Sequence, residues 1–371
     1  MSYRDLLPKT FVTSLGDVRV RRRYYASRVC DCKAVPWDDW SGIPRGHKLT
    51  LAARRMVTLA GSGCSFDEAA LKIDELCFFK VSNDVIRRVC NEEGEQAAQW
   101  MEQSTVPVQA FQEAEGQAEF YSDGVQVKTQ EGWKELRTSV FAKRQAAEPA
   151  EPEQWKDRVL EKPECRLAQA AIAASEQVGA SWQVMLQRLG PQSIERLSVL
   201  ADGARWIWDE AAKRFKLIAN VSWVVDVFHV SEKIHDCGKE MLGVGSEAAS
   251  QWAAARVEEL IRLEGPRFIE RLEQERLAAA DQKTRDALDA LIGYLRHNRD
   301  SLWYRTRLAQ GLPIGSGLVE GTCKNMIGKR LKLNNPEWRV ERAQNMAALR
   351  CLHYSDMWER FWESRGMAKV A

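Results

Sequence analysis

The order of segments along the chain predicts an α/β protein with one main sheet flanked by helices. Between residues 118 and 227, apolar runs of strand length alternate with stretches of helix length. From residue 230 to 310 the apolar residues recur at helical spacing, which favours an all-helical block. The 371 residues suit two or three domains, and 45% hydrophobic residues are enough for a sizeable core. The segments that we expect are 1–45, 46–105, 115–232, 233–312 and 313–371.

The first segment, residues 1–45, has the pattern of a small β-rich unit. Phe11, Val18 and Val20 are separated by charged residues, and Gly16-Asp17 is a turn signal. Alternation of this kind is typical of strands that bury one face.

A close pair of cysteines, Cys30 and Cys32, lies towards the end of this segment. Zinc sites need four ligands, and paired cysteine ligands usually have two to four residues between them. A single residue separates these thiols and no second pair precedes them, so we expect no structural zinc. The nine cysteines, in a sequence without a secretory signal, are expected to be reduced thiols.

The second segment, residues 46–105, is expected to be helical. Ser65-Phe-Asp-Glu68 is a capping-box signature, and Ser82 is a cap residue for a following helix. Two helices joined by a short turn, with Arg87 and Arg88 on the second, are typical of a helix-turn-helix that binds DNA. Periodicity alone does not separate this motif from an ordinary helical bundle.

The third segment, residues 115–232, carries the strands of the main sheet. The strands expected are Phe120–Val127, Trp133–Phe141, Leu197–Ala201 and Ser222–Val227. The first two flank Thr129-Gln-Glu-Gly132 and are expected to form a hairpin. Helical stretches are expected at Leu167–Val178 and Ser181–Leu189.

The fourth segment, residues 233–312, is expected to be all-helical, and 313–371 to be a C-terminal helical part of the core. The clearest amphipathic pattern is that of Leu288, Leu291, Ile292 and Leu295, whose spacings are three, four and seven.

Three acidic residues stand out by their context. Asp123 lies in the apolar run 119–127, Asp202 follows the apolar run 197–201, and Glu320 follows a Gly-Ser-Gly turn. Two aspartates beside strands and a glutamate at a helix start can meet at one end of a sheet. Hard divalent cations prefer oxygen ligands and serve in-line phosphoryl displacement. Most of the 52 acidic residues are expected to be surface charges, and Asp-Gly pairs are ordinary turns, so only context supports this site.

A resemblance to a known family is carried by segments in all parts of the chain. They are Leu200-Ala-Asp-Gly-Ala-Arg-Trp-Ile-Trp208, Val224-Val-Asp-Val-Phe-His229, Gly315-Ser-Gly-Leu-Val-Glu320, Thr13–Tyr25, Ser65–Ala70, Val81-Ser82, Arg330–Lys332, Trp338 and Ala348–Arg350. In this order, across residues 10 to 355, they resemble Mutator-like DDE transposases of bacterial insertion sequences, closest to the ISKra type. Relatives commonly carry two cysteine pairs near the N-terminus, and Cys30-Asp-Cys32 is a degenerate form of that module.

The resemblance implies an RNase H-like catalytic core with an all-helical insertion. It implies that Asp123, Asp202 and Glu320 hold two Mg²⁺ (or Mn²⁺) ions. Water then cuts a phosphodiester at the element end, and the freed 3′-hydroxyl attacks target DNA without a covalent protein–DNA intermediate. The implied partner is double-stranded DNA, both the terminal inverted repeats and the target, bound by a homodimer or higher oligomer.

Asp226 and His229 resemble an Asp-x-x-His element that follows the second catalytic aspartate in these enzymes. We expect them to support the site, with His229 donating a hydrogen bond to a catalytic carboxylate or to a DNA phosphate. A structural histidine is the ordinary alternative. A second assignment, in which Asp226 replaces Asp202 as metal ligand, also stays open; the Asp-Gly pair after an apolar run favours Asp202.

The net charge of +2 does not by itself indicate nucleic-acid binding, but basic residues are clustered. The clusters that we expect to contact DNA contain Arg87, Arg88, Lys324, Lys329 and Arg330. Basic stretches attract phosphates independently of base sequence. A single cluster is more typical of a solvated face.

Two other functions fit the same residues. The three acids also suit a structure-specific nuclease that cuts without joining strands, and a degenerate cysteine module suits a catalytically silent DNA-binding relic or repressor of its element. The sequence has no run of 18 uncharged apolar residues and no apolar signal-peptide core, so we expect no membrane partner. The expected location is the bacterial cytoplasm, in association with the nucleoid.

Overall fold

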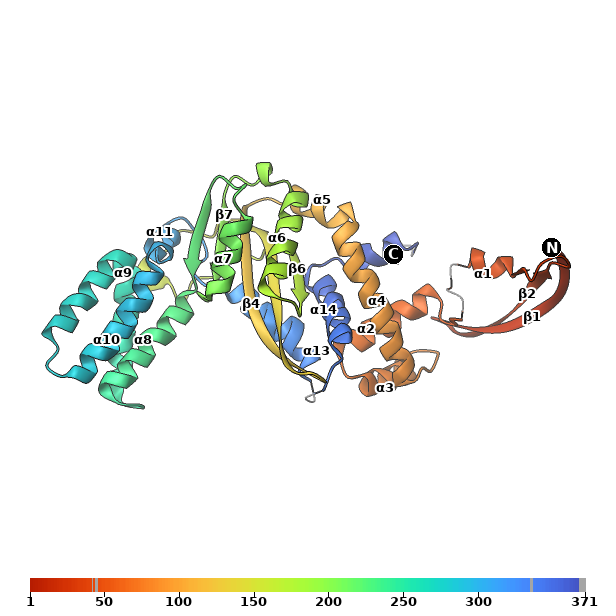
Figure 1. Ribbon diagram of the computed structural model, residues 1–371, viewed down its shortest axis with the longest axis horizontal. Coiled ribbons are helices and arrows are strands. Elements are labelled where there is room, and N and C mark those ends of the chain that lie inside the picture. Colours follow the sequence, from red (N-terminus) through yellow and green to blue (C-terminus); the bar gives the residue numbers. More distant parts are fainter. Residues whose placement is uncertain (42, 44–45, 334–335, 367–371) are drawn as a thin grey trace. The chain divides into compact units, whose positions relative to one another are not determined.

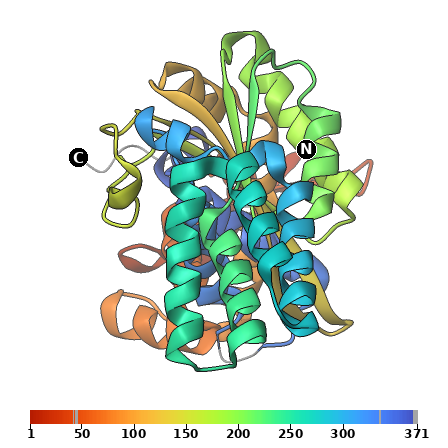
Figure 2. The same cartoon turned by 90° about the vertical axis from the view of Figure 1, so that its left-hand side faces the viewer.

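The computed structural model describes residues 1–371 except 42, 44–45, 334–335 and 367–371, and except the side chains of 319, 320, 322 and 324. It is drawn in Figure 1 and, turned by 90°, in Figure 2. The chain has the predicted mixed α/β class, with helices around two sheets. It divides into two compact units, which combine segments distant in sequence. The first contains 1–103, 127–133 and 326–371, and the second contains 104–126 and 134–325. The expected segment 313–371 is therefore divided between the units.

The first unit begins with the predicted β-rich segment. Its three-stranded sheet has the order β1 (Ser2–Thr13), β2 (Gly16–Ala26) and β3 (Lys33–Ala34), with antiparallel pairing throughout. Gly16, whose φ of 108° favours glycine, begins β2 after the turn. The short helix α1 (Pro36–Trp40) follows β3.

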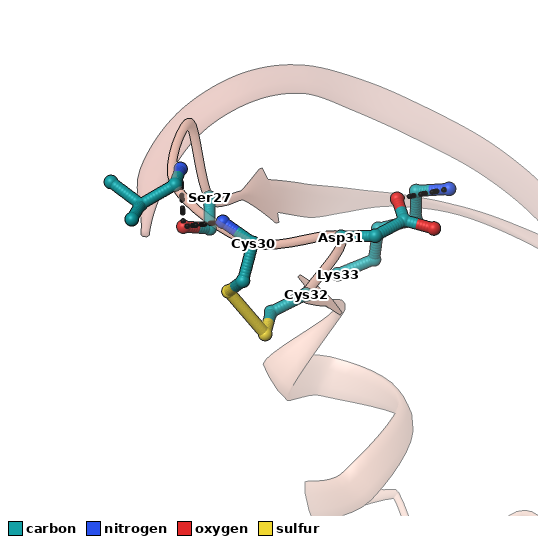
Figure 3. The surroundings of a disulfide bond; sticks show 6 residues. Ser27, Cys30, Asp31, Cys32 and Lys33 are labelled. Carbon is teal, nitrogen blue, oxygen red and sulfur yellow. Dashed lines mark hydrogen bonds and ion pairs between the residues drawn. A yellow bond between two sulfur atoms is a disulfide. The ribbon is translucent and has the colours of Figure 1, made fainter.

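The expectation of reduced thiols is wrong for the closest pair of cysteines, because Cys30 and Cys32 are joined by a disulfide (Figure 3). The turn after β2 brings them together. The Ser27 amide donates to the Cys32 carbonyl, while the Ser27 hydroxyl accepts hydrogen bonds from the amides of Val29 and Cys30. These hydrogen bonds close the turn and place the two sulfur atoms side by side. The amino-acid composition does not reveal such a turn.

The rest of the first unit is helical. Its helices are α2 (Leu51–Gly63), α3 (Phe66–Leu76), α4 (Asn83–Gln103), α13 (Lys329–Leu331), α14 (Val340–Tyr354) and α15 (Trp358–Ser364). The two predicted helix starts are confirmed: the Ser65 hydroxyl accepts from the Glu68 amide at 3.2 Å, and that of Ser82 from the Val85 amide at 3.4 Å.

Buried ion pairs and a close backbone approach hold these helices together. Arg54 of α2 donates to Glu93 at 2.6 Å and to Glu92 at 2.7 Å, both on α4. A Cβ atom at Gly94 of α4 would collide with the backbone of Asn345 on α14, so this crossing requires glycine. Helix α14 therefore packs directly on the predicted DNA-binding segment.

The second unit is built on a five-stranded mixed sheet. Its strands are β4 (Gln117–Thr129), β5 (Gly132–Arg144), β6 (Cys165–Ala171), β7 (Leu197–Ala201) and β8 (Val221–Val225). The spatial order is β6-β5-β4-β7-β8. The pairs β4–β7 and β7–β8 are parallel, whereas β5–β6 is antiparallel. Only two residues join β4 to β5, so this pair is an antiparallel hairpin, as predicted.

The helix expected over Leu167–Val178 is wrong in its first half. Residues 165–171 form the edge strand β6, and helix α6 (Ser175–Leu189) begins only at Ser175. The alanine-rich run has a helical propensity, but pairing with β5, from Lys143↔Cys165 to Arg137↔Ala171, outweighs it. Strand formation here depends on a neighbour that periodicity does not reveal.

Helices cover the sheet and enclose an aromatic core. Besides α6, they are α5 (Thr105–Glu113) and α7 (Arg205–Arg214). Phe120 of β4 lies at the centre, with its ring centroid 4.8–4.9 Å from those of Phe141, Trp182 and Phe215. All four side chains are buried, so they anchor these helices to the strands that carry the candidate site.

The predicted helical block lies between β8 and the C-terminal part of this unit. It contains α8 (Val227–Leu242), α9 (Glu247–Ala278), α10 (Gln282–His297) and α11 (Tyr304–Ala309). Figure 2 shows the long green-to-cyan helices side by side. The residues of the predicted amphipathic stripe on α10 are all buried. Helix α12 (Gly317–Thr322) and a π-helical turn (Cys323–Gly328) follow.

In the part of the chain that the structure describes, we find no helix with the length and apolar character that crossing a membrane requires.

Replacing Phe120 with Ala is expected to destabilise the protein by about 3–5 kcal/mol, because the cavity would lie at the centre of the aromatic core. Thermal or denaturant unfolding measures the change. The matched control is Leu217→Ala, since Leu217 follows α7 but is 61% exposed. Equal stability of the two variants would contradict this description of the core.

Candidate functional site

Three aspartates form a row across three neighbouring parallel strands. Along β4 and β7 the pairing runs from Ala118↔Leu197 to Tyr121↔Leu200, an offset of 79 positions. The same offset relates Asp123 to Asp202. Between β7 and β8 the pairing ends at Ala201↔Val225, an offset of 24 positions, which also relates Asp202 to Asp226.

This row lies where the β4–β7 and β7–β8 pairings end, at the carboxyl edge of the parallel strands. The chain order also reverses here, because β4 connects to β5 on one side while β7 pairs on the other. In open α/β sheets such a point is the usual position of a ligand site. The strands thus bring together the predicted Asp123 and Asp202, with Asp226 at the same level.

Asp123 is partly buried and close to several polar groups. Its carboxylate accepts a hydrogen bond from the Gly124 amide at 2.7 Å. Burial raises the pKa of Asp123, and the charge of Asp202 adds to this, whereas hydrogen bonds from the Cys323 thiol and Gly124 and the charge of His229 lower it. The net effect is a raised pKa, so the ionised form of Asp123 is disfavoured unless a positive charge lies nearby.

Asp202 lies in a tight turn after β7. Its carboxylate accepts from the Ala204 amide at 2.8 Å. Gly203 has a φ of 91°, a left-handed conformation that favours glycine at this position of the turn. The turn leaves the Asp202 carboxylate only partly buried and facing the same edge as Asp123.

Asp226 is buried and its oxygens are engaged by the chain itself. One carboxylate oxygen accepts from the Phe228 amide at 2.7 Å. The other accepts from the Ser316 amide at 2.8 Å and from the Ser316 hydroxyl. Burial raises the pKa of Asp226, but the nearby His229 and the hydrogen bonds from Ser316 and Phe228 outweigh it, so the net pKa is lowered. Asp226 is thus a charged anchor for the Gly315–Gly317 turn.

His229 lies at the exposed side of this row, one helical turn after Asp226. Its Nδ1 atom is 3.8 Å from an Asp226 oxygen, and its side chain is 47% exposed. Interaction with the nearby Asp226 carboxylate raises the pKa of His229 to about 8; burial opposes this, while the charges of Asp202 and Glu232 add to it. His229 therefore carries a positive charge at neutral pH.

Two predicted site residues have side chains outside the described part of the structure. Glu320 lies in α12 and Lys324 in the π-helical turn that follows. Among the side chains that are described, no group of three or more His, Cys, Asp or Glu is arranged to hold a metal ion. The described part of the candidate site therefore consists of the aspartate row and its neighbours.

The remaining predicted DNA contacts lie in the first unit. Arg87 and Arg88 are on α4, where Arg87 pairs with Asp84 and Arg88 is 59% exposed. Lys329 is exposed. Arg330, expected at the surface, is instead buried: it donates to the Gly61 carbonyl at 2.9 Å, and its guanidinium lies over aromatic rings. Aromatic neighbours distant in sequence are the physical reason for this difference.

Two residues near the site had no role assigned from the sequence. Ser316 binds Asp226 from a position 90 residues later, and its location inside the Gly-Ser-Gly turn is the only sequence signal. The Cys323 thiol lies 3.0 Å from the Thr138 hydroxyl and also contacts Asp123. The sequence signal for Cys323 is that it lies three residues, about one helical turn, after Glu320.

Comparison with known families gives a match over almost the whole chain. Residues 2–360 match the model of UPF0236, described as an uncharacterised protein family. The chain belongs to this family. No curated protein matches it. The UPF0236 description names no activity.

In this UPF0236 protein, Asp226→Asn is expected to lower the pKa of His229 from about 8 towards 6.5, because the carboxylate is the main cause of the shift. Titration of the imidazole by NMR measures this. Glu232→Gln is the control and should have a smaller effect, since Glu232 is the weakest contributor named. An unchanged pKa in Asp226→Asn would contradict the interaction.

The stability of the folded protein depends on pH through His229, because proton binding and folding are linked. The folded protein binds the His229 proton more tightly than the unfolded chain does. The resulting stabilisation is fully present below about pH 6.5 and is lost as the pH rises through about 8.

Proposed function

We propose that this protein is a DDE-type DNA transposase of a bacterial insertion sequence, Mutator-like and closest to the ISKra type. The observation that carries the proposal is the alignment of Asp123 with Asp202 across two parallel strands. Paired carboxylates at the carboxyl edge of a sheet suit metal-dependent phosphoryl transfer.

The sheet topology supports an RNase H-like core. Numbered along the second unit, its strands have the order 3-2-1-4-5, and the second strand is antiparallel to its neighbours. The resemblance implies an RNase H-like core, and a mixed sheet with flanking helices is compatible with one. Asp123 lies on the first of these strands and Asp202 directly follows the fourth. The helical block after the fifth strand corresponds to the insertion that the resemblance implies.

Asp123 and Asp202 fit a divalent cation because both supply carboxylate oxygens at the same edge of the sheet. The charge of Asp202 also acts on Asp123, so the two together make this edge more negative. We propose that these residues hold Mg²⁺ or Mn²⁺ together with Glu320. When bound, the ions would neutralise phosphate charge and lower the pKa of the attacking water. Asp226 is a poorer ligand, because its oxygens already accept hydrogen bonds from Phe228 and Ser316.

The other groups of the site position the reacting parts. Asp226 holds Ser316, and thereby the start of the helix that carries Glu320. His229 is charged at neutral pH and partly exposed, so it is suited to donate a hydrogen bond to a phosphate oxygen of bound DNA. Double-stranded DNA is the proposed partner, and we propose a homodimer or higher oligomer as the form that acts on it.

Replacing Asp123 or Asp202 with Ala is expected to abolish Mg²⁺-dependent cleavage of element-end DNA while leaving DNA binding nearly intact, because only metal ligands are lost. Asp209→Ala is the control, since Asp209 is an exposed acid on α7. Cleavage on a labelled duplex and binding by gel shift are measured together. Full cleavage by Asp202→Ala would refute the assignment.

The same preparations distinguish transposase from nuclease. A transposase joins the cleaved 3′ end to target DNA, whereas a nuclease leaves free ends. Joined products are therefore expected with the natural chain and not with Asp123→Ala. Cleavage without joining would favour the nuclease, and DNA binding without cleavage would favour the repressor.

Removal of both Arg87 and Arg88 side chains is expected to weaken binding to element ends and to lower the log–log slope of affinity against salt by about one for each lost phosphate contact. Loss of a base contact would instead relax sequence preference by about 1–3 kcal/mol. Titration of the Arg87→Ala/Arg88→Ala protein with terminal and random duplexes over a salt series measures both. Unchanged affinity at every salt concentration would make α4 an ordinary bundle helix.

A further inference from the structure

A polar cavity lies entirely within the first unit. It has a volume of about 350 Å³ and is formed by the beginnings of α3, α4 and α14, together with residues before α14 and one residue of the β4–β5 turn. The residues that line it include Phe66, Arg87, Arg330, Trp338, Arg339 and Arg342. Its size suits a group as large as a nucleotide.

The cavity carries an excess of arginine charge that the chain does not neutralise. Two of its acidic residues are paired with cations, Asp84 with Arg87 and Glu337 with Lys128 at 2.9 Å, whereas Asp67 accepts only from the neutral Asn83, at 2.6 Å, among the described contacts. No ion pair joins Arg339 or Arg342 to a carboxylate in the part of the chain that the structure describes. Burial lowers the pKa of Arg342, and the charges of Arg87 and Arg339 lower it further, while those of Glu341 and Asp84 oppose this.

Arg330 forms part of the cavity wall and is held rigidly. Its guanidinium carbon lies 4.5 Å from the centre of the Phe66 ring and 5.0 Å from that of Trp338. Its Nε donates to the Gly61 carbonyl. The residue is only 3% exposed, and its Nη2 has no hydrogen-bond partner among the described residues. A buried cationic donor without an acceptor is costly, so an anion in the cavity would offset that cost.

Three helix N-termini meet at the same cavity. Ser65 and Phe66 begin α3, Asn83 begins α4, and Arg339 caps α14, and all four residues line it. The helix dipole adds positive potential at each of these ends. The dipoles and the arginines therefore favour the same kind of ligand.

We propose that this cavity is a binding site for a phosphate group, seated between Arg339, Arg342 and the wall formed by Arg330. Guanidinium groups match phosphate oxygens with paired hydrogen bonds. The site uses none of the aspartates and belongs to the other unit, although Arg87 and Arg330, both predicted DNA contacts, line it. The phosphate has two possible sources, a small phosphate ester or the backbone of a nucleic-acid strand.

Isothermal titration of the full chain with inorganic phosphate tests the site. Saturable binding is expected, and Arg339→Gln and Arg342→Gln should each weaken it about tenfold, since each removes a charged hydrogen-bond donor. Arg360→Gln is the matched control, because Arg360 is an exposed arginine of the same unit outside the cavity. Neither test variant alters Arg330, so folding should persist, and a thermal melt checks it. No saturable binding, or equal affinity in all variants, overturns the proposal.

Competition then identifies the source. Displacement of phosphate by adenosine monophosphate alone indicates a small ester, and displacement by an oligonucleotide without terminal phosphates indicates a strand backbone. Asp123→Asn should bind phosphate as the natural chain does. Loss of phosphate binding in Asp123→Asn would overturn the separate site, whereas failure of DNA cleavage alone would affect only the proposed function.

Discussion

The parallel register of β4, β7 and β8 is the constraint on which the candidate site depends. Because side chains alternate along a strand, a slip of one residue would send Asp123 to the opposite face from Asp202. The buried aromatic side chains around Phe120 pack α6 and α7 on the strands and so stabilise this register. The position of the carboxylates therefore follows from the packing of a core that contains none of them.

The helical block contacts this frame at several places: the Tyr304 hydroxyl donates to the Val225 carbonyl, and Arg307 donates to the hydroxyls of Ser198 and Ser222. The chain leaves the sheet at Val227, whose amide donates to the carbonyl of Ile314, where the chain returns. Asp226 binds Ser316 beside this contact. The two ends of the block are thus held close together. Tyr294 of α10 also lies next to Gly203, beside the row. The Asp226 carboxylate links the two chain segments because it accepts hydrogen bonds from both of them and remains ionised.

The first unit shows the same use of distant segments. The β4–β5 turn joins it through Gln130, whose amide donates to the Trp338 carbonyl, and α14 packs on α4. Arg330 is buried at the centre of this arrangement, between Phe66 and Trp338. A charge that sequence position alone would assign to the surface is stabilised inside by aromatic faces and a carbonyl. Its neighbours Arg339 and Arg342 then give the cavity its positive potential.

The amino-acid sequence by itself determined the elements whose signals are local. Ser65 and Ser82 marked helix starts through their own hydroxyl groups, and Leu288, Leu291 and Leu295 marked the buried face of α10. It also indicated Asp123 and Asp202, because each adjoins an apolar strand. Only the tertiary structure decided that residues 165–171 form a strand, that Arg330 is buried, and that Asp226 is bound by Ser316. Each of these outcomes depends on a partner far away along the chain, and local periodicity carries no information about such partners.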